Sequence, residues 1–130
     1  MRLLLDTHAL IWFAQGDASR MPQAVWDKIT SPHNECVVSF ISLWEIAIKS
    51  NIGKLTFPPI HHPGFPDRLK AEGFELLPLS FPEIRAVATL PDHHRDPFDR
   101  ILVTQSKLHA LTLLSCDTKL DLYNTDRIWL

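Results

Sequence analysis

The feature that most constrains the fold is a series of short apolar runs separated by helix-like segments. Residues 2–5 (RLLL), 36–40 (CVVSF) and 110–116 (ALTLLSC) are almost continuously apolar. A strand with one face in water would alternate apolar and polar residues, whereas a strand buried on both faces reads as a continuous apolar run. Parallel strands also need long crossover connections, which are usually helices. The pattern therefore predicts a parallel sheet with helices on both faces.

The segments between these runs carry helix signals. Gly16 and Gly53 stand where helices are expected to end, and Ser80 with Glu83 has the spacing of a capping box. Weaker strands are expected at 74–79 and 127–130, and helices at 7–14, 22–29, 41–53, 67–72, 80–90 and 96–109. We expect residues 1–130 to form a single three-layer α/β/α domain, with a central parallel sheet of about five strands.

The segment 57–66 (FPPIHHPGFP) interrupts this order with four prolines. Proline lacks the backbone donor that helices and strands use, and clustered prolines are typical of loops. We therefore expect an irregular loop here that serves as an insertion or a lid.

Composition disfavours a membrane protein and a disulfide-bonded one. No apolar stretch approaches the about 20 residues of a membrane helix, and the first residues, MRLLLDTHALIW, lack the pattern of a signal peptide. Cys36 and Cys116 both lie in apolar runs, which predicts buried free thiols in a reducing cytoplasm. The formal net charge of −2 gives no general case for nucleic-acid binding.

Acidic residues stand at the junctions between the apolar runs and the helices. Asp6 directly follows the first run, and Asp117 directly follows the run at 110–116. Asp99 opens the helix that leads into that same run, and Glu45 lies about one turn into the helix after the second run. In an open parallel sheet, ligands bind beyond the carboxyl ends of the strands. Asp6, Asp117 and Glu45 are favoured at this edge of the sheet, and Asp99 is compatible with it.

Several carboxylates at one edge would repel one another unless a cation compensates them. Oxygen-rich sites without thiolates suit Mg²⁺ or Mn²⁺, which retain waters and bind phosphates. Such an ion can activate a water and neutralise the charge that develops on a phosphodiester. The acids therefore indicate metal-dependent chemistry on phosphates, and the sequence signals no organic cofactor.

Each acid also has a purely structural explanation. Asp96 fits a helix N-cap with Asp99 in the favourable first turn, and Ser42 with Glu45 has capping-box spacing. The two aspartates that follow strands could likewise serve as caps or begin turns. However, a cap would work equally well as serine, threonine or asparagine, and here an acid occurs at every junction.

The histidines carry a weaker signal than the acids. His61-His62 and His93-His94 are adjacent pairs, and neither has the spacing of two histidines on one face of a zinc-binding helix. We expect them to be solvated loop residues with a minor role in holding substrate.

Four motifs, in this order, are similar to those of PIN-domain proteins: LLLDTHALIW at 3–12, SLWEIAIK at 42–49, HHRDPFDRILVTQ at 93–105 and LLSCD at 113–117. The resemblance covers essentially the whole chain and is greatest to the VapC-type toxins of bacterial toxin–antitoxin pairs. It implies a Mg²⁺- or Mn²⁺-dependent endoribonuclease with a three-layer α/β/α fold. It also implies a cognate antitoxin protein, a working homodimer, a 5′-phosphate product and no membrane partner.

The resemblance also assigns roles to individual residues. The family's catalytic and metal-binding acids match Asp6, Glu45 and Asp99, with Asp117 as the commonly present fourth. Thr7 and Ser115 match small polar positions that imply help with metal or phosphate binding. The remaining candidates are Asp96 as a helix cap near the metal shell, and Arg95, Arg100 and Lys49 as substrate contacts. The apolar segments ALIWF at 9–13 and SLWEIAI at 42–48 could supply partner surface, although core packing explains most of their residues.

The charge balance is compatible with RNA binding once the site acids are set aside. Without the four matched acids and Asp96, ten acidic residues remain of 15, against 13 basic ones. An acidic pocket within a mildly positive frame suits a protein that grips RNA phosphates.

Two other classes stay open. A phosphatase or phospho-accepting receiver also places an aspartate after a parallel strand, but the dehalogenase-type pattern has a second aspartate two residues later, where this chain has His8. The other class is a PIN-like RNA-binding module without catalysis, and the presence of all four acids argues against it.

Overall fold

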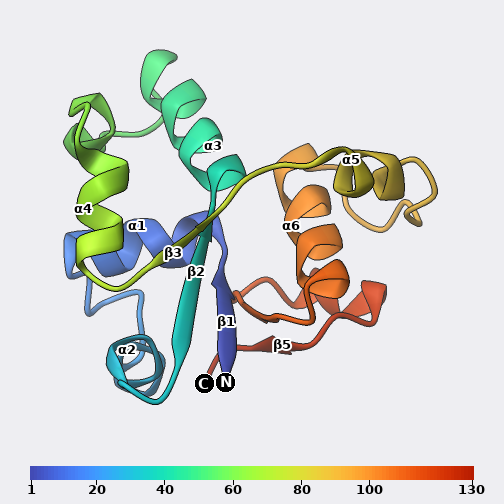
Figure 1. Cartoon of the computed structure of the whole chain (residues 1–130), viewed down its shortest axis with the longest axis horizontal. Helices are drawn as coiled ribbons and strands as arrows, with labels where there is room; N and C mark the ends of the chain where they lie inside the picture. The colour runs from blue at the N-terminus through green and yellow to red at the C-terminus, as the bar shows by residue number, and fades with distance from the viewer.

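The central layer is a five-stranded sheet in which every strand pairs in parallel with its neighbours, in the order β3-β2-β1-β4-β5. A computed structural model describes all residues, 1–130 (Figure 1). The strands are β1 (Arg2–Leu5), β2 (Glu35–Ser39), β3 (Glu75–Leu77), β4 (Thr112–Leu114) and β5 (Arg127–Ile128). The prediction of an α/β fold around about five parallel strands is confirmed.

Helices cover both faces of this sheet (Figure 1). They are α1 (Thr7–Gln15), α2 (Gln23–Thr30), α3 (Phe40–Asn51), α4 (Phe65–Ala71), α5 (Phe81–Val87) and α6 (Pro97–Leu108), with short 3-10 turns η1 (Pro58–His61) and η2 (Thr118–Tyr123). The helices α1, α2 and α4 lie on one face, and α5 and α6 lie on the other. Because α3 begins at the edge of the sheet, its residues reach the cores on both sides.

Alternate residues of the strands pack into two separate cores. Leu3 and Leu5 of β1 belong to a core of 17 buried residues on the face of α1, α2 and α4. Leu4, between them, belongs to a core of nine buried residues on the face of α6. Full burial of a leucine side chain stabilises the fold by about 1.5–3 kcal/mol. The run of leucines is therefore continuous because each face of β1 has its own core.

The chain changes its direction across the sheet between β1 and β4. It runs outward from β1 through β2 to β3, and then crosses to β4 and β5 on the other side of β1. In open parallel sheets, such a reversal leaves a crevice at the carboxyl ends of the two strands, and ligands bind there. Asp6 follows β1 and Asp117 lies shortly after β4, so both stand at this crevice.

The boundary between β2 and α3 differs from the sequence prediction. Ser39, and not Ser42, is the N-cap of α3, and its hydroxyl accepts the N–H of Ile41 at 3.1 Å. The apolar run continues through Phe40 into the helix, which hid the boundary. The explanation of Glu45 as part of a capping box with Ser42 is therefore wrong, since Glu45 lies in the second turn of α3.

The proline-rich segment is ordered against the core. Phe57 and Phe65, at its two ends, are 2% and 6% exposed, and their rings pack edge to face with centroids 5.8 Å apart. Between them the chain forms η1, and α4 begins at Phe65. The segment contains no strand, as expected, but it is not irregular throughout, because η1 and the start of α4 lie within it. Its role as an insertion or a lid stays a prediction.

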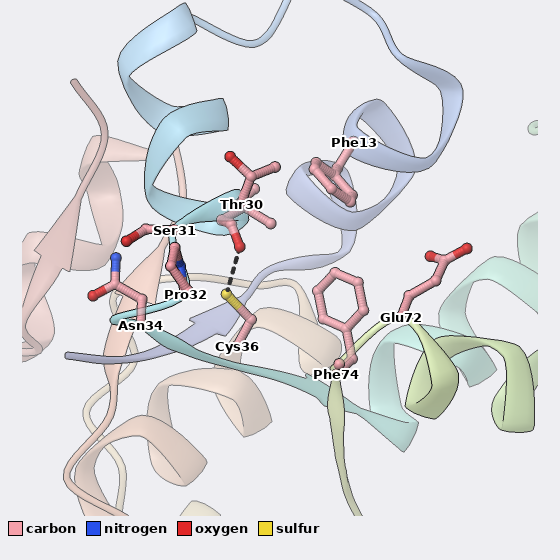
Figure 2. A pocket seen from close by; sticks show the side chains of 10 residues that line it. Phe13, Thr30, Ser31, Pro32, Asn34, Cys36, Glu72 and Phe74 are labelled. Carbon is pink, nitrogen blue, oxygen red and sulfur yellow. Dashed lines mark hydrogen bonds between the residues drawn. The ribbon is translucent and has the colours of Figure 1, made fainter.

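A hollow of about 450 Å³ lies where α2 leads into β2, and Figure 2 shows its lining. Phe13 and Phe74 form one wall, and the Cys36 thiol donates to the carbonyl of Ile29 at 3.5 Å. Burial raises the pKa of Cys36 to about 11, so this thiol is not a nucleophile at neutral pH. The hollow lies at the amino end of β2, at the edge of the sheet opposite the acids.

Two expectations from composition have different outcomes. No helix of the structure has the length and apolar character needed to cross a membrane. Cys36 is buried as predicted, but Cys116 is exposed, so the prediction of two buried thiols is wrong for Cys116.

Candidate active site

Asp6 is the first residue beyond β1 and the N-cap of α1. Its Oδ1 accepts the N–H of Ala9 at 2.7 Å, and the residue is only 5% exposed. Burial raises the pKa of Asp6, and the charge of Glu45 adds to the effect. The neighbouring Ser115 hydroxyl acts in the opposite direction and lowers the pKa of Asp6. A buried carboxyl group therefore stands at the crevice in the field of a second acid.

Asp99 reaches the same edge from the first turn of α6. Because α6 leads by a short turn into β4, its N-terminus lies at the carboxyl edge of the sheet. Asp96 is the N-cap, as predicted, and its Oδ1 accepts the N–H groups of Phe98 at 2.8 Å and Asp99 at 3.4 Å. Burial, followed by the charges of Asp96 and Asp6, raises the pKa of Asp99 to about 7. Burial and two neighbouring acids therefore both disfavour a negative charge on Asp99 in the folded chain.

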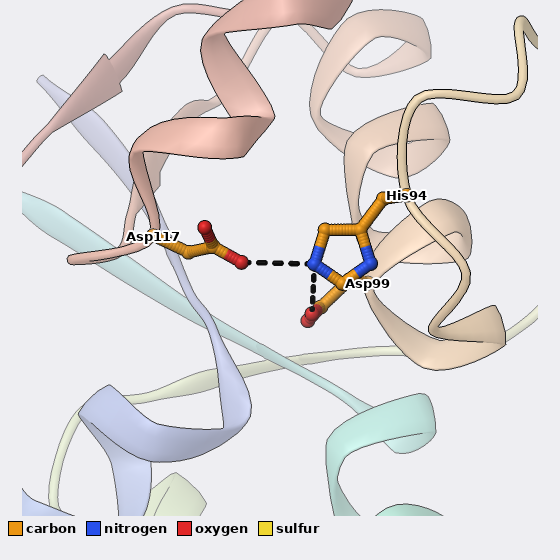
Figure 3. Close-up of side chains that lie close together, drawn as sticks. All are labelled: His94, Asp99 and Asp117. Carbon is orange, nitrogen blue, oxygen red and sulfur yellow. Dashed lines mark hydrogen bonds and ion pairs between the residues drawn. The ribbon is translucent and has the colours of Figure 1, made fainter.

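His94 lies between Asp99 and Asp117, as Figure 3 shows. Its Nε2 is 2.9 Å from Oδ2 of Asp117 and 3.4 Å from Oδ2 of Asp99. One ligand atom from each of the three side chains lies within 4.8 Å of the others. The side chain of His94 is 15% exposed, so the expectation of a solvated loop histidine is wrong for this residue.

The backbone determines which nitrogen of His94 carries the proton. The N–H of Asp96 donates to Nδ1 of His94 at 3.0 Å, so Nδ1 must offer a lone pair. A neutral ring then carries its hydrogen on Nε2, which points at the two carboxylates. Metal coordination would need a lone pair on Nε2 instead. His94 is therefore arranged as a hydrogen-bond donor that holds Asp99 and Asp117 together.

Glu45 projects from α3 and is 2% exposed. Thr7 donates to its Oε1 at 2.6 Å, and the ammonium group of Lys49 lies 2.5 Å from its Oε2. Burial alone would lower the pKa of Lys49, but the hydrogen bond and charge of Glu45, with Asp96 and Asp99 adding to them, raise it. Lys49 therefore stays charged and pairs directly with Glu45, whereas no lysine or arginine forms a direct ion pair with the aspartates of the site.

The other predicted polar residues have distinct positions. Ser115 is fully buried and its hydroxyl accepts the N–H of Asp117 at 3.1 Å, so it helps to fix the backbone at that acid. Arg95 is exposed beside His94. The sequence predicts that Arg100 contacts substrate, but its side chain is only 17% exposed. Its guanidinium donates to the carbonyls of residues 90 and 91 and to the Tyr123 hydroxyl. It fixes the loop before α6 instead.

The donor set fits a hard divalent cation. Its free ligand atoms are carboxylate oxygens, and burial together with the charges of Asp96 and Asp6 raises the pKa of Asp99. Mg²⁺ and Mn²⁺ bind such oxygens, usually through one or two carboxylates and several waters. Asp99 and Asp117 could hold the ion directly, with Asp6 and Glu45 behind them.

The family of the chain follows from its sequence over nearly its whole length. Residues 3–127 match the model of the PIN domain family. The chain belongs to the PIN domain family. PIN domains are generally nucleases and typically use a divalent metal ion, so membership supports hydrolysis of nucleic acid as the activity.

Solved structures share the fold of this PIN domain. VapBC2 from Rickettsia felis, bound to a DNA fragment from its promoter, superposes with a TM-score of 0.68 at 14% identity, over 100% of both chains. VapBC-1 from nontypeable Haemophilus influenzae gives 0.65 at 19% identity, over 100% of this chain and 97% of that one. A toxin–antitoxin complex from Klebsiella pneumoniae gives 0.62 at 20% identity, over 97% and 95%. No curated protein matches the sequence.

Sequence reasoning missed two features of the site. It treated Lys49 as a substrate contact, although the four-residue spacing from Glu45 allows an ion pair along a helix, which is what the structure contains. It also missed His94, whose only sequence signal is its position beside Asp96 and Asp99 in HHRDPFD. The hydrogen bond from the Asp96 N–H to the His94 ring depends on the conformation of the loop. The spacing of apolar residues in the sequence does not predict a loop conformation.

Proposed function

We propose that this PIN-domain protein is a Mg²⁺- or Mn²⁺-dependent endoribonuclease whose catalytic residues are Asp6, Glu45, Asp99 and Asp117. The observation that carries the proposal is the gathering of acids from distant parts of the chain at the β1/β4 crevice. The charges of Asp6 and Glu45 raise the pKa of Asp99. Nε2 of His94 lies close to Oδ2 of both Asp99 and Asp117. Such a concentration of buried negative charge is costly to the fold and is typical of functional sites.

In this proposal the aspartates hold the cation, directly or through water, and Glu45 orients the attacking water. A bound divalent ion would neutralise the acids and activate water for in-line attack on a phosphodiester. The Thr7 and Lys49 contacts fix both oxygens of Glu45. Ser115 accepts the backbone N–H of Asp117 and so helps to position that acid. The family implies a 5′-phosphate on the product.

We also propose that residues 1–130 form a single nuclease domain that acts as the toxin of a toxin–antitoxin pair. Support comes from the fold, which is shared with chains of complexes described as VapBC or as toxin–antitoxin. The partner would be a small antitoxin that inhibits cleavage. A cytoplasmic location stays a prediction.

A homodimer is proposed as the working unit, and α3 offers a surface for it. Phe40, Trp44 and Ile48 follow one another at four-residue spacing and are 42%, 56% and 36% exposed. A row of exposed apolar side chains along one helix is typical of an interaction surface. The segment ALIWF at 9–13 is a poorer candidate, because its first three residues are buried.

The activity is tested by incubating the protein with RNA in Mn²⁺, with EDTA as the control. Asp6→Asn should abolish cleavage because it removes the charge of the side chain. The side-chain volume hardly changes, so circular dichroism should show an intact fold. Asp67→Asn, which removes an exposed acid of α4, is the matched control and should cleave normally. Full activity of Asp6→Asn would remove Asp6 from the mechanism, and trapping of a phosphorylated aspartate would favour a phosphatase instead.

The partner is tested by purifying the complex with the product of an adjacent open reading frame. An inactive complex that regains nuclease activity when the partner is removed would support inhibition. Equal activity with and without the partner would contradict it.

A further inference from the structure

A second hollow, of about 380 Å³, lies between α1 and the C-terminal end of α3. One wall is apolar and comes from Ile11, Trp12 and Leu55. The charged side chains that line it are all basic. They are Arg20, Lys49 and Lys54, and the remaining lining residues are Thr7, His8 and Gln15. The hollow therefore combines positive charge with an apolar wall and lacks any carboxylate.

The hollow adjoins the acidic cluster directly. Two of its lining residues, Thr7 and Lys49, are the side chains that hold the oxygens of Glu45. A ligand in the hollow would thus touch the same side chains that position a catalytic acid. Because Glu45 already pairs with Lys49, the uncommitted positive charge of the hollow comes from its other two cations.

Lys54 and Arg20 are available to a ligand. Lys54 is exposed and its ammonium group has no carboxylate partner, and Arg20 has only Asp17, at 3.7 Å. The guanidinium carbon of Arg20 lies 5.9 Å from the centre of the Trp12 ring, a distance typical of cation–π contacts. Trp12 is itself packed edge to face against Trp129. The tryptophan therefore holds the charge of Arg20 at the rim of the hollow.

We propose that this hollow binds the segment of a single-stranded RNA next to the bond that is cleaved. Arg20 and Lys54 contact backbone phosphates, and the half-buried side chains of Trp12 and Leu55 receive an unstacked base. A duplex keeps its bases stacked and paired inside, whereas proteins that bind single strands combine a basic groove with apolar or aromatic contacts to bases. This proposal rests on the proposed ribonuclease activity, because it gives the same site its substrate path.

The opposite side of the acidic cluster has a matching feature. His94, which contacts Asp117, also lines a hollow together with Arg95 and Lys119. The acids are therefore bordered by basic residues both at Glu45 and at Asp117. An RNA strand that crosses the acidic cluster could therefore contact basic residues on both sides of the scissile bond. A single isolated pocket would provide such contacts on one side only.

The test is a salt titration of RNA binding in EDTA, so that no strand is cut. A short fluorescein-labelled single-stranded RNA is titrated with wild type, with the double variant Arg20→Ala/Lys54→Ala, and with Lys70→Ala/Arg85→Ala. The last variant removes the same charge from exposed positions on α4 and α5. The first double variant should reduce the slope of log K against log salt by about 1.4, or about 0.7 for each lost phosphate contact. The control should keep the wild-type slope.

The outcomes separate this proposal from the ribonuclease proposal. An unchanged slope in Arg20→Ala/Lys54→Ala, or a wild type that binds no RNA at low salt, overturns the binding path. If wild type still cleaves RNA in Mn²⁺, the proposed function survives that result. If the double variant instead loses only its protein partner and keeps the RNA slope, the hollow takes an acidic peptide and the proposal is wrong.

Discussion

Replacing Asp99 with asparagine should stabilise the metal-free protein and remove its capacity to bind Mn²⁺. Burial and the charges of Asp96 and Asp6 raise the pKa of Asp99 from 3.8 to about 7. A shift of about three units corresponds to about 4 kcal/mol of unfavourable ionisation in the folded chain. The side chain is 20% exposed and the variant loses the contact with His94. We therefore expect a net gain of about 2 kcal/mol in the free energy of unfolding at pH 8.

The gain has a defined dependence on pH. Because the folded pKa of Asp99 is the higher one, the folded chain holds this proton more tightly than the unfolded chain does. Ionisation of Asp99 thus lowers the free energy of unfolding of the wild type as the pH rises from about 4 to about 7. Asparagine carries no such charge. The difference in the free energy of unfolding between Asp99→Asn and the wild type should therefore be small near about pH 4, grow as the pH rises to about 7 and level off above it.

Urea unfolding in EDTA across this pH range measures the effect, and Asp67→Asn controls for the loss of an exposed acid. A parallel series with Mn²⁺ should raise the stability of the wild type, since the ion binds the folded state, and leave Asp99→Asn unchanged. The reasoning is refuted if Asp99→Asn is less stable than the wild type at pH 8 in EDTA. It is also refuted if the difference does not vary with pH.

Three further predictions follow from the neighbouring contacts. His94→Gln, which keeps an N–H donor, should retain more nuclease activity than His94→Ala. In the wild type, ¹⁵N NMR should show the ring proton on Nε2. Equal loss of activity in both variants, or a ring proton on Nδ1, would contradict the donor role of His94. Lys49→Met leaves the buried charge of Glu45 unpaired and should cost about 3 kcal/mol in urea unfolding, the lower end for a broken buried pair because the Lys49 side chain is 33% exposed. A change within error would mean that Glu45 is compensated elsewhere. If the proposed homodimer forms through α3, Trp44→Glu should convert it into monomers in sedimentation velocity, and a dimer that survives this substitution would exclude the surface.

The sheet could be predicted from the sequence because burial on two faces leaves a readable pattern. The leucines of β1 enter two cores in alternation, so the run had to be continuous. The capping box of Ser80 and Glu83 was also predictable, since both of its hydrogen bonds are local. The positions of the acids at one edge followed from the ends of the strands, which places Asp6 and Asp117 beside the same crevice.

The features that escaped prediction depend on contacts between distant residues. Phe57 and Phe65 order the proline-rich segment by packing into the core, and proline content alone predicted a loop. His94 enters the site because the chain folds back so that its ring faces Asp117. Arg100 directly follows Asp99 in the sequence, yet its guanidinium supports the preceding loop. Sequence neighbours of a motif therefore differ in role according to where their side chains point.

The most direct test is a crystal of the protein soaked in Mn²⁺ and measured at a wavelength where manganese scatters anomalously. The proposed site predicts an anomalous peak at the β1/β4 crevice, within about 2.3 Å of a carboxylate oxygen of Asp99 or Asp117. No such peak should occur in Asp99→Asn crystals treated in the same way. Crystals of active protein with no peak at this crevice, at Mn²⁺ concentrations that support cleavage, would contradict a metal-dependent site at these acids.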